Sequence, residues 1–273
     1  MLQDIMPKKL NNHYSAEIMP ENNSMIFHFK GSDVLVSETS SPFPAYGKII
    51  PEHSVYLFSI GDVKYFLARD MSVKVPDGYT YQNIKKLRTS GNVGKEDFFA
   101  LFTAYHLSEW YRSNCFCGRC GQRTELYRAE RAVRCTGCGK IIYPRLNPAV
   151  IVGVTNGNKL LITHYVQNRG VTCNALVAGF TEIGETFEET VSREVMEEVG
   201  LKVRNIRYYK SQPWGFSGGI LAGFFCDVDG SDVITLDKSE LSSAVWTEKN
   251  DITGQTDDYS LTNEMMMYFK NSF

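Results

Sequence analysis

The chain has 273 residues with a formal net charge of -2, so it has no global basic field for tight, nonspecific nucleic-acid binding. Its length allows two or three units that each bury a core. The N-terminal residues include an acid, and no stretch approaches about 18 apolar residues, so we expect no signal peptide, no membrane span and a cytoplasmic protein. Seven cysteines, four of them in two close pairs, favour metal binding in a reducing compartment over disulfides.

Residues 1–112 are predicted to form an N-terminal α+β domain. Residues 24–37 resemble two short strands around a Gly-Ser-Asp turn, and residues 54–70 predict two stronger strands on either side of Gly61 and Asp62. Residues 95–111 place aromatic and apolar side chains three and four positions apart, which predicts a helix with a packed face. The histidines of this domain have no partner at ligand spacing, so we interpret the domain as scaffold.

Residues 113–144 are predicted to form a zinc ribbon. Two Cys-x-x-Cys-Gly motifs contain Cys117 with Cys120 and Cys135 with Cys138. Such paired thiolates can hold one tetrahedral Zn²⁺, and the glycine after each pair lets the turn pass close to the metal. Because four thiolates leave no open position for a substrate, we expect a structural zinc. Cys115 belongs to neither motif.

Two other interpretations of the ribbon stay open. Either Cys-x-x-Cys motif could serve redox chemistry, although two matched motifs exceed what that chemistry needs. The ribbon could also bind nucleic acid, since it is rich in arginine, although Glu125 and Glu130 dilute the positive charge. The arginines are Arg119, Arg123, Arg128, Arg131 and Arg134.

Residues 145–273 predict a mixed sheet flanked by helices. Segments of strand character occur at 149–154, 160–163, 176–178 and 220–227, and a helix is expected from about 260 to 270. Strands that lead into a helix and then into more strands are typical of a sheet with helices on its faces. Residues 208–219 predict an aromatic, glycine-containing loop, which is either an ordinary turn or a segment that bends around a flat ligand.

A helix with an acidic face is predicted between Gly184 and Gly200. Glu194, Glu197 and Glu198 stand at i, i+3 and i+4, so their side chains fall on one narrow stripe of that helix. Valines on an adjoining stripe would bury one side and leave the acidic side along a cleft. A hard cation such as Mg²⁺ or Mn²⁺ would turn the repulsion among these carboxylates into coordination.

The alternative for this helix is a surface salt-bridge ladder through Glu189, Arg193 and Glu197. The wider pattern argues against a ladder alone. It reads Gly179, five residues, Glu185, seven residues, Arg193-Glu194, two residues, Glu197-Glu198, one residue, Gly200 and Leu201. Position for position, this pattern resembles the 23-residue box of the Nudix hydrolases.

The ribbon before this box and the Ser-Gln-Pro-Trp sequence after it are similar to the NADH pyrophosphatase branch of that family, over roughly residues 95–273. The resemblance implies cleavage of the diphosphate of NADH or NAD to nicotinamide mononucleotide and AMP, and removal of NAD caps from RNA. It also implies Mg²⁺ or Mn²⁺ and a homodimer. The predicted architecture is therefore a Nudix-type mixed sheet preceded by a zinc ribbon and an N-terminal α+β domain.

The resemblance also assigns site residues. It implies that Glu194, Glu197 and Glu198 bind the catalytic metal, with Glu240 as a fourth acidic ligand outside the box. Phe180 matches the aromatic residue that stacks on nicotinamide. Tyr143 matches a tyrosine that crosses the dimer.

The loop after the box is expected to bind substrate through Ser211, Gln212, Pro213, Trp214 and Phe216. It departs from the pattern of the branch, Ser-Gln-Pro-Trp-Pro-Phe-Pro-x-Ser. Both later prolines and the final serine are replaced here, by Gly215, Ser217 and Gly219. Because proline fixes φ, we expect a looser loop, and the altered residues do not support a preference for NADH over other nucleotides.

The expected mechanism is attack of water on one phosphorus of the diphosphate, assisted by the metal. Glu185 and Arg193 would support the metal ligands, and Glu182 or a box glutamate would accept the proton. Two alternatives stay open. One is a Nudix hydrolase of other nucleoside diphosphate derivatives such as ADP-ribose. The other is a non-catalytic nucleic-acid-binding protein built on the zinc ribbon.

Overall fold

The chain divides into two compact units in a computed structural model that describes residues 1–37, 42–166 and 173–272. One unit comprises Met1–Gln3 and Leu146–Phe273, and the other comprises Asp4–Arg145. The segment predicted as a zinc ribbon lies within the second of these units.

Two small sheets and one long helix form most of the unit Asp4–Arg145. The sheets have the strand orders β1-β5-β6-β2 and β3-β4-β7. The strands are β1 (Leu10–Asn11), β2 (Met25–Phe27), β3 (Phe29–Lys30), β4 (Asp33–Ser37), β5 (Ser54–Ile60), β6 (Val63–Ala68) and β7 (Tyr79–Asn83). The helices are α1 (Ile84–Ser90) and α2 (Lys95–Ser113). Both predicted hairpins and the predicted helix are present, whereas β7 and α1 were not predicted.

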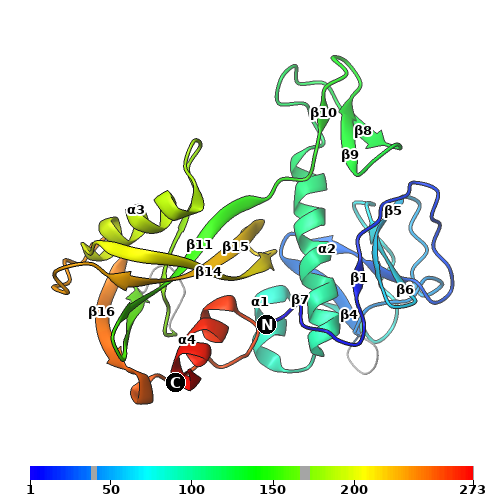
Figure 1. The fold of residues 1–273 in the computed structure, drawn as a ribbon. Coiled ribbons are helices and arrows are strands. Elements are labelled where there is room, and N and C mark those ends of the chain that lie inside the picture. The colour runs from blue at the N-terminus through cyan, green and yellow to red at the C-terminus, as the bar shows by residue number, and fades with distance from the viewer. Residues whose placement is uncertain (38–41, 167–172, 273) are drawn as a thin grey trace. The chain divides into compact units, whose positions relative to one another are not determined.

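A three-stranded antiparallel sheet forms the ribbon, in the order β10-β9-β8 (Figure 1). Its strands are β8 (Thr124–Tyr127), β9 (Ala132–Cys135) and β10 (Ile141–Ile142). Few apolar side chains are available to these short strands, and of their residues only Ala132, Val133 and Cys135 of β9 are buried. A sheet of this size needs a metal or another cross-link in place of a large core.

A six-stranded mixed sheet organises the other unit, in the order β14-β15-β11-β12-β16, with β13 paired to β11. The β11–β15 pair is parallel and the other pairs are antiparallel, as predicted for a mixed sheet. The strands are β11 (Asn147–Asn156), β12 (Lys159–Tyr165), β13 (Val177–Phe180), β14 (Val203–Trp214), β15 (Gly219–Val228) and β16 (Leu241–Glu248).

Helices cover both faces of this sheet. The helices are α3 (Phe187–Val199) and α4 (Leu261–Asn271), with the short 3₁₀ helix η2 (Lys249–Asp251) after β16. In β11, Val150 and Val152 pack in the same cluster as the valines of α3, whereas Ile151 packs with Met265 of α4. Figure 1 shows α3 and α4 on opposite sides of the sheet. The alternation along β11 thus produces two apolar layers, because successive side chains point to opposite faces.

No described helix is long and apolar enough to span a membrane.

Candidate active site

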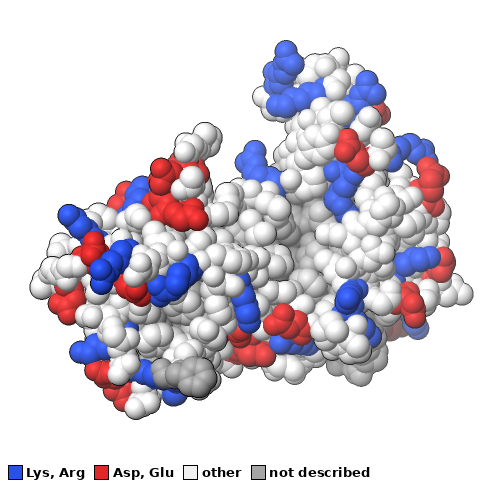
Figure 2. All heavy atoms as spheres, in the orientation of Figure 1, with Lys and Arg blue, Asp and Glu red and all other residues white. Residues whose placement is uncertain are grey.

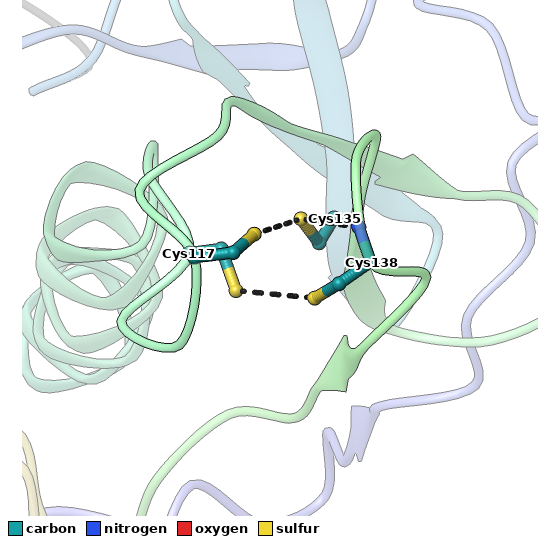
Figure 3. Close-up of side chains that lie close together, drawn as sticks. Cys117, Cys135 and Cys138 are labelled. Atoms are coloured by element: carbon teal, nitrogen blue, oxygen red, sulfur yellow. Dashed lines mark hydrogen bonds between the residues drawn. The ribbon is translucent and has the colours of Figure 1, made fainter.

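The ribbon brings the cysteines of its two motifs together (Figure 3). Cys117 Sγ lies 3.8 Å from Cys138 Sγ, and Cys120 Sγ lies 3.4 Å from Cys135 Sγ. All four sulfur atoms lie within 4.8 Å of one another. Zn–S bonds of about 2.3 Å in a tetrahedron place sulfur atoms about 3.8 Å apart, so this cluster fits one zinc ion.

Backbone N–H groups favour the thiolate forms that such an ion needs. Gly137 N and Cys138 N each donate to Cys135 Sγ at 3.4 Å. The Cys138 N–H is the main cause that lowers the pKa of Cys135 to about 6. Cys115 instead donates to the Tyr111 carbonyl and lies outside the cluster. Four thiolates would close the coordination sphere, which suits a structural zinc.

Local sequence signals define both ends of α3. Thr186 is the N-cap, and it forms a capping box with Glu189: Thr186 Oγ1 accepts from Glu189 N, and Glu189 Oε2 accepts from Thr186 N. At the other end Gly200 ends the helix in the left-handed conformation, with φ 71°. The helix buries Val191, Val195 and Val199 completely, as the spacing predicted.

Arg193 is the centre of the charged face of α3. It donates to both oxygens of Glu185, at 2.6 and 2.8 Å, and to Glu194 Oε1 at 2.7 Å. It also donates to Glu197 Oε2 at 3.0 Å and to the Phe180 carbonyl at 3.0 Å. The salt-bridge ladder is therefore present only as its Arg193–Glu197 step, because Glu189 is used in the capping box.

The carboxylates around Arg193 have different electrostatic environments. The Arg193 guanidinium, followed by the Glu182 backbone N–H, lowers the pKa of Glu185 to about 2, so Glu185 is an anion that anchors the arginine. Burial is the main cause that raises the pKa of Glu194, and the nearby charges of Glu197 and Glu240 raise it further. Glu194 is therefore close to negative charges from both the box, at Glu197, and the loop before β16, at Glu240.

Two features favour a cation at this face of α3. Glu198 is only 2% exposed, and a carboxylate buried this deeply is either protonated or balanced by positive charge. A Cβ added to Gly179 would lie 1.9 Å from Glu194 Cδ, so the glycine provides the space in which this carboxylate sits. Among the described residues, no three of the box carboxylates and Glu240 come within 4.8 Å of one another. The donor set of carboxylate oxygens nevertheless suits a hard divalent cation.

The residues expected to contact substrate lie in different environments. Phe180 is 52% exposed at the end of β13, and Trp214 and Phe216 meet edge to face at 6.0 Å. Tyr143 belongs to the unit Asp4–Arg145, where it is exposed and its hydroxyl donates to Glu130 at 2.8 Å.

The prediction of a loop at residues 208–219 is wrong for residues 208–214, which belong to β14, and for Gly219, which begins β15. Gln212 in this strand is fully buried. Its Nε2 donates to Gln3 Oε1 and to the Tyr259 carbonyl, and its Oε1 accepts from Leu261 N. The side chain thus connects β14 to the start of α4. Ser211 and Pro213, its exposed neighbours, point to the opposite side of the strand, as the period of two requires.

The turn at residues 215–218 is held by Asn147 at the start of β11. Asn147 Nδ2 donates to the Ser217 carbonyl at 3.1 Å, and Asn147 N donates to the Gly218 carbonyl at 3.0 Å. A Cβ at Gly219 would lie 2.9 Å from the Asn147 carbonyl oxygen. The glycine that departs from the branch pattern therefore permits the close approach of β15 to β11.

Sequence reasoning missed two contributions to this site. The Thr190 hydroxyl is buried and donates to Glu185 Oε2 at 3.0 Å, so it helps to orient the anchor of Arg193. The sequence does contain the signal for the capping box, because Thr186 and Glu189 are separated by two residues. Nothing in the sequence signalled the contact of Thr190, because it depends on how the preceding loop folds back on the helix.

Comparison with known proteins provides independent evidence. The model of the NUDIX domain matches residues 145–267, and the model of the NADH pyrophosphatase zinc ribbon domain matches residues 112–143. The chain is 33% identical over 221 residues to the NAD-capped RNA hydrolase NudC of Haemophilus influenzae, covering 80% of this chain and 81% of the relative.

Two further relatives carry the same name. That of Actinobacillus succinogenes is 42% identical over 166 residues, covering 59% of this chain and 62% of the relative. That of Enterobacter sp. is 40% identical over 146 residues, covering 54% and 56%.

Proposed function

We propose that this chain, which belongs to the Nudix hydrolase family and carries its NADH pyrophosphatase zinc ribbon, hydrolyses the diphosphate of NADH and NAD to nicotinamide mononucleotide and AMP. Removal of NAD caps from RNA is the same reaction on a longer substrate and belongs to the proposal. The observation that carries it is the set of box carboxylates organised on one face of α3 by Arg193. The names of the relatives support the substrate.

The proposed catalytic cation is Mg²⁺ or Mn²⁺, with Glu194, Glu197, Glu198 and Glu240 as its ligands. When bound, it would neutralise the diphosphate and lower the pKa of the attacking water. Arg193 positions Glu194 and Glu197, because its guanidinium donates to both and is itself fixed by Glu185.

Other residues would bind the substrate and move the proton. The ring of Phe180 is accessible for stacking on nicotinamide. In a homodimer, a second copy of the chain would supply Tyr143. Proton acceptance falls to a box glutamate or to Glu182, which is exposed beside Glu185. A cytoplasmic location, where NAD and RNA both occur, completes the proposal.

The proposal is tested by measuring AMP release from NADH, NAD and ADP-ribose with Mn²⁺. We expect Glu197→Gln to reduce the rate at least about a hundredfold, because it removes a metal ligand. Glu188→Gln is the matched control, since Glu188 is an exposed acid on the same helix and should tolerate the change. Equal rates for Glu197→Gln and wild type would overturn the metal assignment. Absence of AMP from all three substrates would overturn the activity.

A second candidate is hydrolysis of other nucleoside diphosphate derivatives such as ADP-ribose. The observation that favours it is the altered turn at Gly215, Ser217 and Gly219, which replaces residues typical of the NADH pyrophosphatase branch. The same assay separates the two candidates, because a higher kcat/KM for ADP-ribose than for NADH would select the second one.

A further inference from the structure

The zinc ribbon carries a basic surface that the proposed chemistry does not use. We define this ribbon surface as Arg119, Arg123, Arg134 and Lys140 together with Phe116, all of which are exposed. In the described part of the chain, none of its four cations forms a salt bridge. Figure 2 shows Lys and Arg side chains gathered on the ribbon. The ribbon is locally basic, although the whole chain has a net charge of -2.

The other two arginines of the ribbon have structural partners. Arg128 pairs with Glu17 at 3.1 Å. Arg131 donates to the Leu57 carbonyl, and its guanidinium lies over the Tyr14 ring. These contacts join the ribbon to the preceding part of its own unit, so Arg128 and Arg131 are excluded from the ribbon surface.

The four exposed cations do not serve to neutralise the negative charge of the zinc-binding thiolates. In the described ribbon, backbone N–H groups donate to the cysteine sulfur atoms, among them those of Arg119, Gly137 and Cys138. The side chains of the ribbon surface make no such hydrogen bond and extend into solvent. Glu130 accepts from the Tyr143 hydroxyl, which leaves Glu125 as the other acid of the ribbon.

Phe116 gives this surface a second property. It is 56% exposed, so part of its ring is accessible to a ligand. The guanidinium of Arg123 lies 5.3 Å from the centre of its ring, and the two backbones form a β-bridge. An exposed aromatic ring beside unpaired cations is the arrangement on which unpaired bases stack while phosphates are neutralised.

We propose that the ribbon surface binds single-stranded RNA, with phosphates at the four cations and an unpaired base on Phe116. The identification of this RNA as the chain of a capped substrate rests on the proposed function. The binding itself is independent of hydrolysis. Charge complementarity selects a nucleic acid, and the stacking position on Phe116 selects an unpaired strand over a duplex.

The test uses the full chain with zinc bound and a fluorescent, uncapped single-stranded RNA. We expect Arg119→Gln/Arg123→Gln to weaken binding about tenfold near physiological salt, and to reduce the steepness of log K against log salt by about 1.4, the value for two lost phosphate contacts. Phe116→Ala should weaken binding about tenfold with little change in that slope. Lys85→Gln/Lys86→Gln on α1 removes the same charge from exposed lysines and should leave binding unchanged.

Hydrolysis of free NAD and of NAD-capped RNA by the same variants completes the test. We expect an unchanged kcat/KM for NAD and an approximately tenfold lower kcat/KM for the capped RNA. Equal RNA binding by wild type and both ribbon variants, with zinc content intact, would overturn the inference, as would equal affinity for duplex RNA. If RNA binding is lost as predicted but no variant or wild type cleaves NAD, the proposed function fails and the RNA site stands.

Discussion

At the scale of single residues, hydrogen bonds fix the charged side chains of the box relative to one another. Arg193 holds Glu185, Glu194 and Glu197 at once, and it reaches the Phe180 carbonyl of the neighbouring strand. A lysine could not reproduce this, because one ammonium group lacks the planar fork of a guanidinium. The arrangement gives Arg193 and Glu185 a positioning role toward the carboxylates that are proposed to bind metal.

Gly179→Ala is expected to lower activity about a hundredfold while the protein stays folded. The new Cβ would lie 1.9 Å from Glu194 Cδ, so the carboxylate must move, and displacement of a catalytic group by about 1 Å costs about that factor. Activity and thermal unfolding should be measured together. Gly94→Ala is the control, since the nearest atom to its Cβ is 4.0 Å away. Wild-type activity in Gly179→Ala would refute the positioning role.

At the scale of elements, α3 depends on its caps as well as on its valine stripe. Thr186→Ala removes the N-cap side chain and one half of the capping box. We expect a loss of about 1 kcal/mol in the free energy of unfolding, measured by denaturant titration. Ser192→Ala on the exposed side of the same helix is the control. An unchanged midpoint for Thr186→Ala would show that packing against the sheet alone defines the helix start.

The β14–β15 pair carries an acid-sensitive contact. Arg207 is the main cause that lowers the pKa of Asp227 from 3.8 to about 2, and Asn205 and Thr155 also donate to this carboxylate. Because the folded pKa is the lower one, Asp227 stabilises the fold above about pH 4, and this stability is lost as pH falls towards 2.

Asp227→Asn should therefore flatten the dependence of unfolding free energy on pH between about 4 and 2. Thermal unfolding across that range provides the measurement. Asp229→Asn is a suitable control, because the Asp229 carboxylate lies farther from its arginine, at 3.8 Å from Arg204 Nε. A pH dependence in Asp227→Asn as steep as in the wild type would contradict the assignment.

At the scale of the whole molecule, the chain combines two units that each bury an apolar core, and the ribbon is the part that does not. The unit with the mixed sheet has apolar layers on both faces. The ribbon in the other unit lacks such a core, and its three strands depend on the cysteine cluster. The division into domains at residues 112 and 144 stays a prediction, because the structure groups the ribbon with the N-terminal segment.

Zinc content provides the prediction at this scale. Wild type should retain one zinc per chain by elemental analysis, because four cysteine sulfurs form one cluster. Cys138→Ser should lose most of it and unfold at a lower temperature, and a strong chelator should have the same effect on the wild type. Cys115→Ser should keep the metal, since Cys115 lies outside the cluster. Zinc loss in both variants would contradict the assigned ligand set.

Much of the site could be predicted from sequence because its signals are local. Spacing alone placed Glu194, Glu197 and Glu198 on one face of a helix, and paired cysteines alone indicated the zinc cluster. Apolar runs of strand length likewise predicted β11, β12, β13 and β15, whereas β14 and β16 were not predicted as strands. These features follow from the period of a helix or strand and from ligand chemistry, which act over a few neighbouring residues.

Only the tertiary structure decided which long-range contacts complete these local patterns. Gln212 was predicted to face substrate, yet it is buried against Gln3 and the start of α4, because β14 extends through residues expected to form a loop. The space that Gly179 leaves for Glu194 also depends on how closely β13 and α3 pack. The sequence by itself determined the chemistry of the groups, whereas packing between distant elements decided where each group points.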